Sequence, residues 1–175
     1  MSVSVVCRAA ARGVSAPAVR SDARRLLTIL HEARAELTVS LVDDVEMHRL
    51  NREYRQKDRP TDVLAFALRE GPRIAGDEAV LGDVVISLDT AARQAREHAV
   101  PTAHEVRTLL IHGVLHLLGY DHERSAAEAR RMKAMERRLL EHLRCGGMQD
   151  VGGGAKKCSP HPSPGGRGST AKTRG

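Results

Sequence analysis

The sequence contains few aromatic residues. Its 175 residues include no tryptophan, one phenylalanine (Phe66) and two tyrosines (Tyr54 and Tyr120). Proteins that bind single-stranded nucleic acid by stacking successive bases need several exposed rings. The shortage of rings therefore largely excludes that class, and any contact with nucleic acid has to be made through phosphates.

Cysteines and long apolar runs are also scarce. The three cysteines, Cys7, Cys145 and Cys158, are widely spaced and form no C-x-x-C pair. This argues against a disulfide framework and favours a reducing, cytoplasmic location. No window approaches the roughly 18 apolar residues of a membrane-spanning helix. The N-terminal segment has no basic stretch ahead of its short apolar run, which predicts a strand rather than a signal peptide.

Acidic residues are missing from the end of the chain. The formal net charge is +6, but five basic residues and no acidic residue fall within residues 151–175, so the rest of the chain is nearly neutral. Residues 146–175 also contain nine of the 15 glycines. Such a segment cannot bury enough surface to offset its ordering entropy. The sequence therefore predicts one folded domain, residues 1–145, followed by a disordered, basic tail, residues 146–175.

The hydrophobic pattern predicts four strands and five helices in an α/β (α+β) arrangement. Short β-branched or alternating segments indicate strands at about residues 3–7, 36–42, 61–68 and 81–87. Apolar residues at three- and four-residue steps indicate helices at about residues 17–33, 45–54, 87–98, 101–118 and 125–144. Residues 54–60 are interpreted as a polar, basic loop.

The strongest chemical signal is HGVLHLLGYDH, residues 112–122. His112 and His116 lie four residues apart near the end of a predicted helix, on one face and roughly 6 Å apart along its axis. Gly119 can take a left-handed conformation, end the helix and turn the chain so that His122 joins the pair. Three neutral nitrogen donors with an open fourth position are typical of a catalytic site for one zinc ion.

An isolated histidine pair at this spacing is usually a surface pair, or two core histidines with partners. Here the pair lies in an apolar helix, where two uncoordinated imidazoles would be costly to bury. The turn glycine and the third histidine support the metal interpretation independently.

The position after the first histidine narrows the reaction class. The spacing matches the zinc peptidase pattern H-E-x-x-H-x-x-G-x-x-H, with Gly113 in place of the glutamate. That glutamate is the general base of such peptidases, and glycine cannot accept a proton. A phosphodiester substrate fits better than a peptide, because a metal and an arginine can stabilise the negative charge of its transition state.

Three segments together resemble a known family. HGVLHLLGYDH, LNREYRQKDRPTDVLAF (50–66) and LGDVVIS (81–87) are similar to the YbeY endoribonucleases, bacterial factors in ribosomal RNA maturation. The resemblance covers about residues 36–143, with the motifs in the family's order. It implies a single domain in which about five helices pack on a small mixed four-stranded sheet, with a metal site at the end of a central helix.

The resemblance also implies a site and a function. One Zn²⁺ ion would be held by His112, His116 and His122, and Arg55 would be the catalytic arginine. The implied activity is that of a zinc-dependent, single-strand-specific endoribonuclease in 16S rRNA 3′-end maturation and ribosome quality control. The implied partners are single-stranded RNA, ribosomal RNA and proteins of the ribosomal subunit, and neither DNA nor a membrane is expected. The alternative is a ribosome-associated assembly or binding factor whose metal is mainly structural, which the missing base favours.

The chain departs from the family's pattern at three positions. Gln56 follows the arginine where the family commonly has glycine, and Ala65 and Ala67 replace the serine and proline of a VLSFP motif. The predicted metal ligands are unaffected.

Weaker candidates accompany this site. Asp121 is interpreted either as a carboxylate that orients a histidine or as a turn residue. Asp83 either reaches the cleft from a strand end or is simply exposed. A basic run either contacts phosphates or is solvated, and it comprises Arg49, Arg52, Arg55, Lys57 and Arg59.

Overall fold

A mixed four-stranded sheet forms the centre of the fold. The computed structural model describes residues 2–68, 80–120 and 125–145, so the predicted tail lies outside the described residues. The sheet has the order β1-β2-β4-β3. Three strands are parallel, and β3 pairs antiparallel with β4 at one edge. The strands span Ser2–Cys7 (β1), Glu36–Val42 (β2), Val63–Ala67 (β3) and Val80–Ser87 (β4). The predicted sheet is thereby confirmed.

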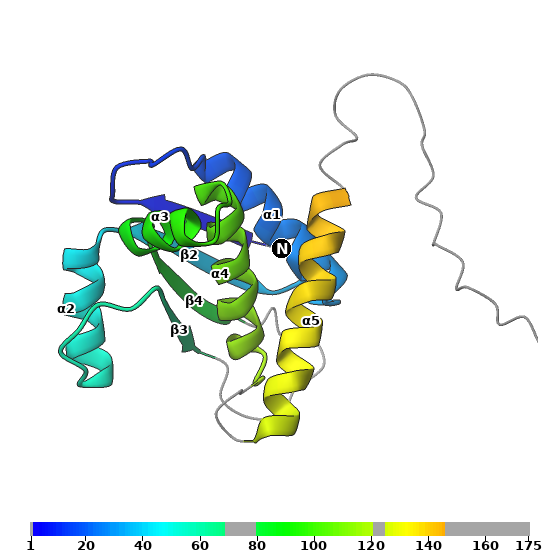
Figure 1. Cartoon of the computed structure of the whole chain (residues 1–175). Coiled ribbons are helices and arrows are strands. Elements are labelled where there is room, and N and C mark those ends of the chain that lie inside the picture. The colour runs from blue at the N-terminus through cyan, green and yellow to red at the C-terminus, as the bar shows by residue number, and fades with distance from the viewer. Residues whose placement is uncertain (1, 69–79, 121–124, 146–175) are drawn as a thin grey trace, which may run out of the picture.

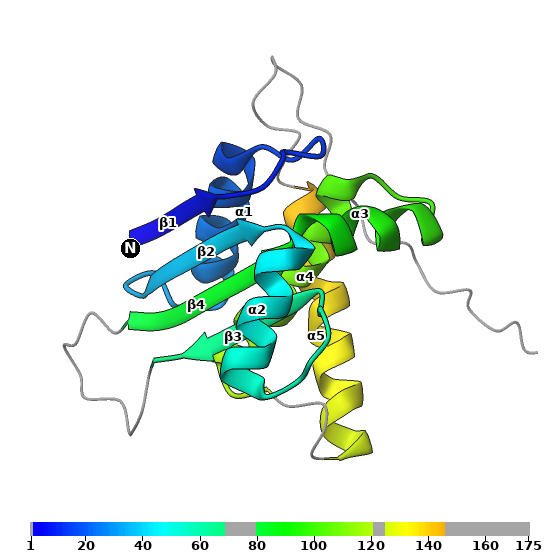
Figure 2. The same ribbon diagram turned by 90° about the vertical axis from the view of Figure 1, so that its left-hand side faces the viewer.

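Helices cover the two faces of this sheet unequally. They span Ala16–Ile29 (α1), Asp44–Arg55 (α2), Leu88–Glu97 (α3), Thr102–Leu117 (α4) and Ala126–Cys145 (α5). The helices α1, α4 and α5 pack over one face and enclose the larger core, whereas α2 covers the other face near β3 (Figures 1 and 2). None of the helices in the described ranges is both long and apolar enough to cross a membrane.

The central helix is α4. It contributes nine buried residues, and the side chains of Leu110, Val114 and Leu115 are completely buried. Polar contacts also tie α1 to its neighbours on this face. Asp22 of α1 accepts a hydrogen bond from Arg107 Nε of α4 at 2.8 Å. A helix buried on this scale is held in place by most of the domain, which suits it to carry a site that needs fixed geometry.

The other face has a small core of its own beneath α2. Met47 of α2 packs with Leu64 and Val85 of the sheet, and Leu50 and Phe66 are partly buried beside them. The two aspartates that start α2 have different roles, which the sequence did not distinguish. Asp43 caps the helix by accepting from the Glu46 amide at 2.9 Å. Asp44 accepts hydrogen bonds that join α2 to the start of α3, from Ser87 (2.6 Å), Thr90 (2.8 Å) and Arg93 (2.6 Å).

Two predicted boundaries were wrong. The first helix ends at Ile29 rather than near residue 33, because His31 takes a left-handed φ of 59° and the chain turns into β2. The basic loop predicted for residues 54–60 begins later, because Tyr54 and Arg55 are the last two residues of α2. The helix is capped by Gln56, whose backbone amide donates to the Asn51 carbonyl, so Arg55 is still helical.

Candidate active site

Two of the three predicted metal ligands lie together on α4. His112 and His116 are one turn apart near the C-terminal end of the helix, and their Nε2 atoms are 3.0 Å apart. The ring centroids are 4.6 Å apart and the planes meet at 72°. Two nitrogens bound to one tetrahedral zinc ion at about 2.05 Å lie about 3.3 Å apart. The pair is therefore close to the geometry that a shared zinc ion requires.

A glutamate from another helix fixes the first histidine. The Nδ1 atom of His112 lies 2.6 Å from Oε1 of Glu136 on α5. An ionised carboxylate can only accept a hydrogen bond, so a neutral His112 that bonds to it carries its proton on Nδ1 and its lone pair on Nε2. Histidines that bind metals commonly donate their second ring nitrogen to a carboxylate in this way.

The sequence reasoning missed Glu136, although a signal for it was present. Glu136 is four residues after Met132 and three before Leu139, both of which are buried. It therefore interrupts the apolar face of α5 with a charge. A carboxylate on the buried face of an amphipathic helix needs a partner.

The third predicted ligand, His122, lies outside the described residues, as does Asp121. Gly119 has a φ of +87° and follows directly on the end of α4, so the predicted left-handed turn is present. Whether the chain then brings His122 to the pair stays a prediction.

Gly113 has a packing role that the sequence did not reveal. A Cβ atom at this position would lie 2.7 Å from Val84 Cγ1 and 3.3 Å from Val63 Cγ2. The position faces the sheet, where α4 approaches β3 and β4 closely. The glutamate of the zinc peptidases would not fit at this position. The close packing of α4 on the sheet therefore accounts for the absence of that general base.

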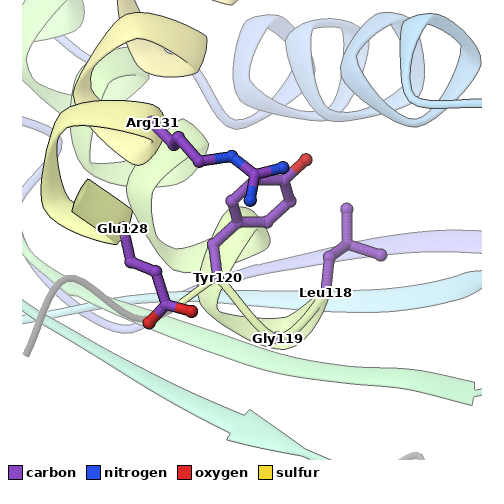
Figure 3. Close-up of a pocket in the computed structure, with 5 residues that line it drawn as sticks. All are labelled: Leu118, Gly119, Tyr120, Glu128 and Arg131. Atoms are coloured by element: carbon purple, nitrogen blue, oxygen red, sulfur yellow. The ribbon is translucent and has the colours of Figure 1, made fainter. Parts of the chain in front are cut away.

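A pocket of about 330 Å³ lies beside the last turn of α4 (Figure 3). Leu118, Gly119 and Tyr120 line it from the end of α4, and Glu128 and Arg131 line it from α5. The Oε2 atom of Glu128 is buried and makes no hydrogen bond within the described part of the chain. The pocket thus combines a carboxylate, a guanidinium and a phenol, which suits a polar ligand rather than an apolar one.

The predicted catalytic arginine is the last residue of α2 and is exposed. The residues after it are tied back to the helix through Asn51, whose side chain is almost completely buried. Asn51 donates from Nδ2 to the Arg59 carbonyl at 2.6 Å, and its own carbonyl accepts from the Lys57 amide at 3.3 Å. The segment that follows Arg55 is therefore an ordered turn.

The basic run divides into paired and unpaired members. Arg49 bonds to Glu46 (2.9 Å) and Glu53 (2.7 Å), and hydrogen bonding to the Glu46 carboxylate raises the pKa of Arg49. Arg49 is thus neutralised on its own helix. In the described ranges, four residues form no ion pair and remain available for phosphates: Arg52, Arg55, Lys57 and Arg59.

Gln56 stands at the position where the resemblance led us to expect glycine. It caps α2 with a left-handed backbone, at φ 55° and ψ 28°. Glycine takes this conformation without steric cost, and other residues do not. Gln56 in place of glycine therefore strains the backbone locally, and the course of the chain is unchanged.

The histidines and Arg55 approach β3 from opposite faces. Gly113 of α4 meets Val63 on one face, and Tyr54 of α2 contacts Phe66 on the other. Figure 2 shows α2 in front of β3 and α4 behind it. The helix that carries the histidine pair thus lies on one side of the edge strand, and the helix that ends at Arg55 lies on the other.

Several known proteins are similar in sequence to this chain. A family model described as Endoribonuclease YbeY matches residues 7–144. The chain belongs to the YbeY family. Relatives named Endoribonuclease YbeY include one from Syntrophotalea carbinolica, 50% identical over 70% of this chain and 82% of the relative. Another, from Geobacter metallireducens, is 46% identical over 82% of this chain and 96% of the relative. Family membership confirms the predicted RNA endonuclease.

A solved structure supports the fold. The solution structure of TM1509 from Thermotoga maritima aligns with a TM-score of 0.58 and 26% sequence identity. The alignment covers 88% of this chain and 99% of that one. The predicted YbeY fold, with its mixed sheet and five helices, is therefore confirmed.

Proposed function

We propose that this YbeY chain is a zinc-dependent endoribonuclease that cleaves single-stranded RNA, with ribosomal RNA as its target. The observation that carries the proposal is the His112–His116 pair, whose Nε2 atoms are 3.0 Å apart while Glu136 holds the outer nitrogen of His112. His112, His116 and His122 would hold the ion. When bound, zinc would supply Lewis-acid stabilisation of the charge that develops on the phosphodiester.

Arg55 has the complementary role in this proposal. Its guanidinium would donate hydrogen bonds to the non-bridging oxygens of the scissile phosphate or of its neighbour, where charge-assisted bonds are strongest. It is exposed and forms no ion pair among the described residues, so no described carboxylate competes with a phosphate for it. The RNA strand would have to pass the free edge of β3 to contact both Arg55 and the histidines.

The ribosomal setting rests on the resemblance of the three sequence motifs. The proposed substrate is the 3′ end of 16S rRNA, and the proposed partners are proteins of the ribosomal subunit. A cytoplasmic location is supported by Cys7, which carries a free and exposed thiol.

One experiment tests the proposed function against the assembly-factor alternative. Purified wild type, Arg55→Ala, His116→Ala and the control Arg20→Ala, an exposed arginine on α1, are incubated with single-stranded ribosomal RNA, and bound metal is measured by mass spectrometry. We expect His116→Ala to lose metal and cleavage. Arg55→Ala should keep its metal and fold but cleave about 10²- to 10³-fold more slowly, as when one transition-state donor is removed. Arg20→Ala should cleave nearly as wild type, because α1 packs beside β1 at the opposite edge of the sheet from β3.

Two results would change the proposal. Equal cleavage by Arg55→Ala and wild type would show that Arg55 is not catalytic. A metal-loaded wild type that binds the RNA but does not cleave it would favour the assembly factor. The product ends then identify the nucleophile, because a cyclic phosphate requires attack by the ribose 2′-hydroxyl.

A further inference from the structure

Tyr54 is an exposed ring immediately before Arg55. Its residue is 61% exposed, although it continues the helix face on which Met47 is completely buried and Leu50 partly buried. The end of α2 extends over the edge strand β3, where little of the domain remains to cover a side chain. The exposure of Tyr54 therefore follows from the position of the helix over the sheet.

The ring is nevertheless held in place. It meets Phe66 of β3 in an edge-type contact, with centroids 5.3 Å apart and planes at 70°. An edge-type contact covers at most one face of the tyrosine ring, and the residue as a whole stays 61% exposed. A ring that is already positioned loses little conformational freedom when a second ring stacks on it.

The surroundings of Tyr54 match one nucleotide of a single strand. Arg55 is its neighbour in sequence, and Arg52 and Lys57 are close by on the same helix end and the turn that follows. Exposed cations beside an exposed ring provide both contacts that a nucleotide offers, a phosphate and the flat face of a base. Two carboxylates at this end of α2 already have partners, because Glu53 bonds to Arg49 and Asp58 bonds to His48.

Tyr54 also lies across one strand from the histidine site. A Cβ atom placed on Gly82 would overlap the Phe66 carbonyl oxygen and would lie 3.1 Å from Leu117 Cδ2. Phe66 carries the Tyr54 contact, and Leu117 follows His116 directly in α4. The end of α2 and the last turn of α4 therefore lie near the same end of the β3–β4 pair, and β3 is the edge strand of the sheet.

We propose that Tyr54 is a base-stacking site for the RNA substrate. One unpaired base stacks on its ring, Arg55 contacts the adjoining phosphate, and the strand continues around the edge of β3 to the histidines. This inference rests on the proposed function, because its ligand is the single-stranded RNA of that reaction. It also refines the argument from composition: few rings exclude the stacking of successive bases but permit the stacking of one.

The absence of tryptophan from the chain provides a direct test. Tyr54→Trp introduces a single fluorescent reporter at the proposed site. Val45→Trp introduces the same reporter at a position on the same helix that is 80% exposed. A short single-stranded oligoribonucleotide should quench the fluorescence of the first variant and leave the second nearly unchanged. The same sequence as a duplex should quench neither strongly, since its bases are already stacked.

Binding affinities provide the second test, measured by fluorescence anisotropy while gels show that the strand is intact. Tyr54→Ala should weaken binding about 5- to 100-fold, the loss expected for one stacked base, whereas Tyr54→Phe should bind within about twofold of wild type. The salt dependence separates stacking from charge. Tyr54→Ala should leave the slope of log K against log salt unchanged, and Arg55→Ala should reduce its magnitude by about 0.7.

The outcomes distinguish this inference from the proposed function. Wild-type affinity in Tyr54→Ala, or equal quenching at both reporter positions, would overturn the stacking site while the proposed function stands. A wild type that does not bind single-stranded RNA would overturn the proposed function itself. Tyr54→Leu keeps an apolar contact with Phe66 without a flat face, so weak binding by a folded Tyr54→Leu variant supports stacking even if Tyr54→Ala is unstable.

Discussion

The two sides of the edge strand β3 are constructed differently. On the α4 side, His112 and His116 belong to a helix in the larger core, and Glu136 from α5 fixes one ring at 2.6 Å. On the α2 side, Tyr54 and Arg55 stand exposed at the end of a helix that covers only a small second core. Metal ligands must hold their positions to a few tenths of an ångström, whereas contacts to a phosphate or a base tolerate movement and intervening water.

The difference predicts two classes of mutational effect. Changes on the α4 side should alter metal affinity and stability together, because the proposed ligands belong to a helix that is packed in the core. Changes at the exposed end of α2 should alter RNA affinity with little effect on folding. The variants below separate the two sides, beginning with the largest expected effect.

Glu136→Ala should weaken zinc binding about 10- to 100-fold, the usual cost of removing a group that orients a metal-bound histidine. Glu136→Gln should fall between this variant and wild type, because its amide oxygen can still accept from His112 Nδ1. Competition with a chromophoric chelator measures the affinity, and Arg137→Ala, an exposed neighbour on α5, is the control. Unchanged zinc affinity in Glu136→Ala would show that the carboxylate does not support the site.

Asp44→Asn should lower the free energy of unfolding by about 2 kcal/mol at neutral pH, because Asp44 accepts bonds from Ser87, Thr90 and Arg93 that fix the start of α2. Partial burial raises the pKa of the Asp44 carboxyl, but hydrogen bonds from Arg93, Ser87 and Thr90 outweigh it and keep the pKa below the ordinary value of 3.8.

The sign of the pH dependence follows from this lowered pKa. The stabilisation is fully present above the ordinary value of 3.8 and is lost as the pH falls through the lower folded-state pKa. Urea unfolding of wild type and Asp44→Asn should therefore give a difference that is constant from neutral pH to about pH 5 and shrinks below pH 3.8. A difference that grows in acid would contradict this assignment.

Gly113→Ala should destabilise the domain by about 1 kcal/mol. The added methyl group would lie 2.7 Å from a methyl group of the completely buried Val84, and overpacking of this kind costs about 1–3 kcal/mol. The higher helix propensity of alanine offsets up to about 1 kcal/mol of that cost. Denaturant unfolding of the zinc-free protein measures the effect. The companion variant Gly113→Ala/Val84→Ala should recover helix stability relative to Val84→Ala alone, and its failure to do so would place the strain elsewhere.

The features that could be predicted from the sequence are those that depend on the spacing of residues close together in the chain. Two histidines four residues apart define a shared helix face without any knowledge of the fold, and Gly119 marks the end of that helix. Glu136 could not be assigned in this way, since it comes from another helix 24 residues after His112. The packing role of Gly113 depends on Val63 and Val84, which only the folded sheet brings together.

The basic run shows the same limit on the α2 side. Counting charges gave five equivalent cations, but helical geometry places Arg49 within reach of Glu46 and Glu53. Arg55 forms no ion pair with any residue that the structure describes. The exposure of Tyr54 could not be predicted from the sequence either. The helix pattern places its ring on the inward face, and the ring is exposed only because α2 ends over the edge of the sheet. Sequence spacing thus predicts candidate residues, and the tertiary structure shows which of the described ones are exposed and which have partners.

Gln56→Gly is expected to have the smallest effect and the opposite sign. Relief of the left-handed backbone at φ 55° should raise the free energy of unfolding by about 0.5 kcal/mol, after the greater freedom of glycine in the unfolded chain is subtracted. Ala99→Gly is a matched control, because Ala99 has a φ of 54° after α3, away from the proposed RNA path. Both variants should gain stability in thermal unfolding and cleave single-stranded RNA within about twofold of wild type, since neither contributes a phosphate contact. A strong loss of cleavage in Gln56→Gly alone would show that the α2 side needs a fixed backbone after Arg55, and the contrast between a rigid α4 side and a tolerant α2 side would then be wrong.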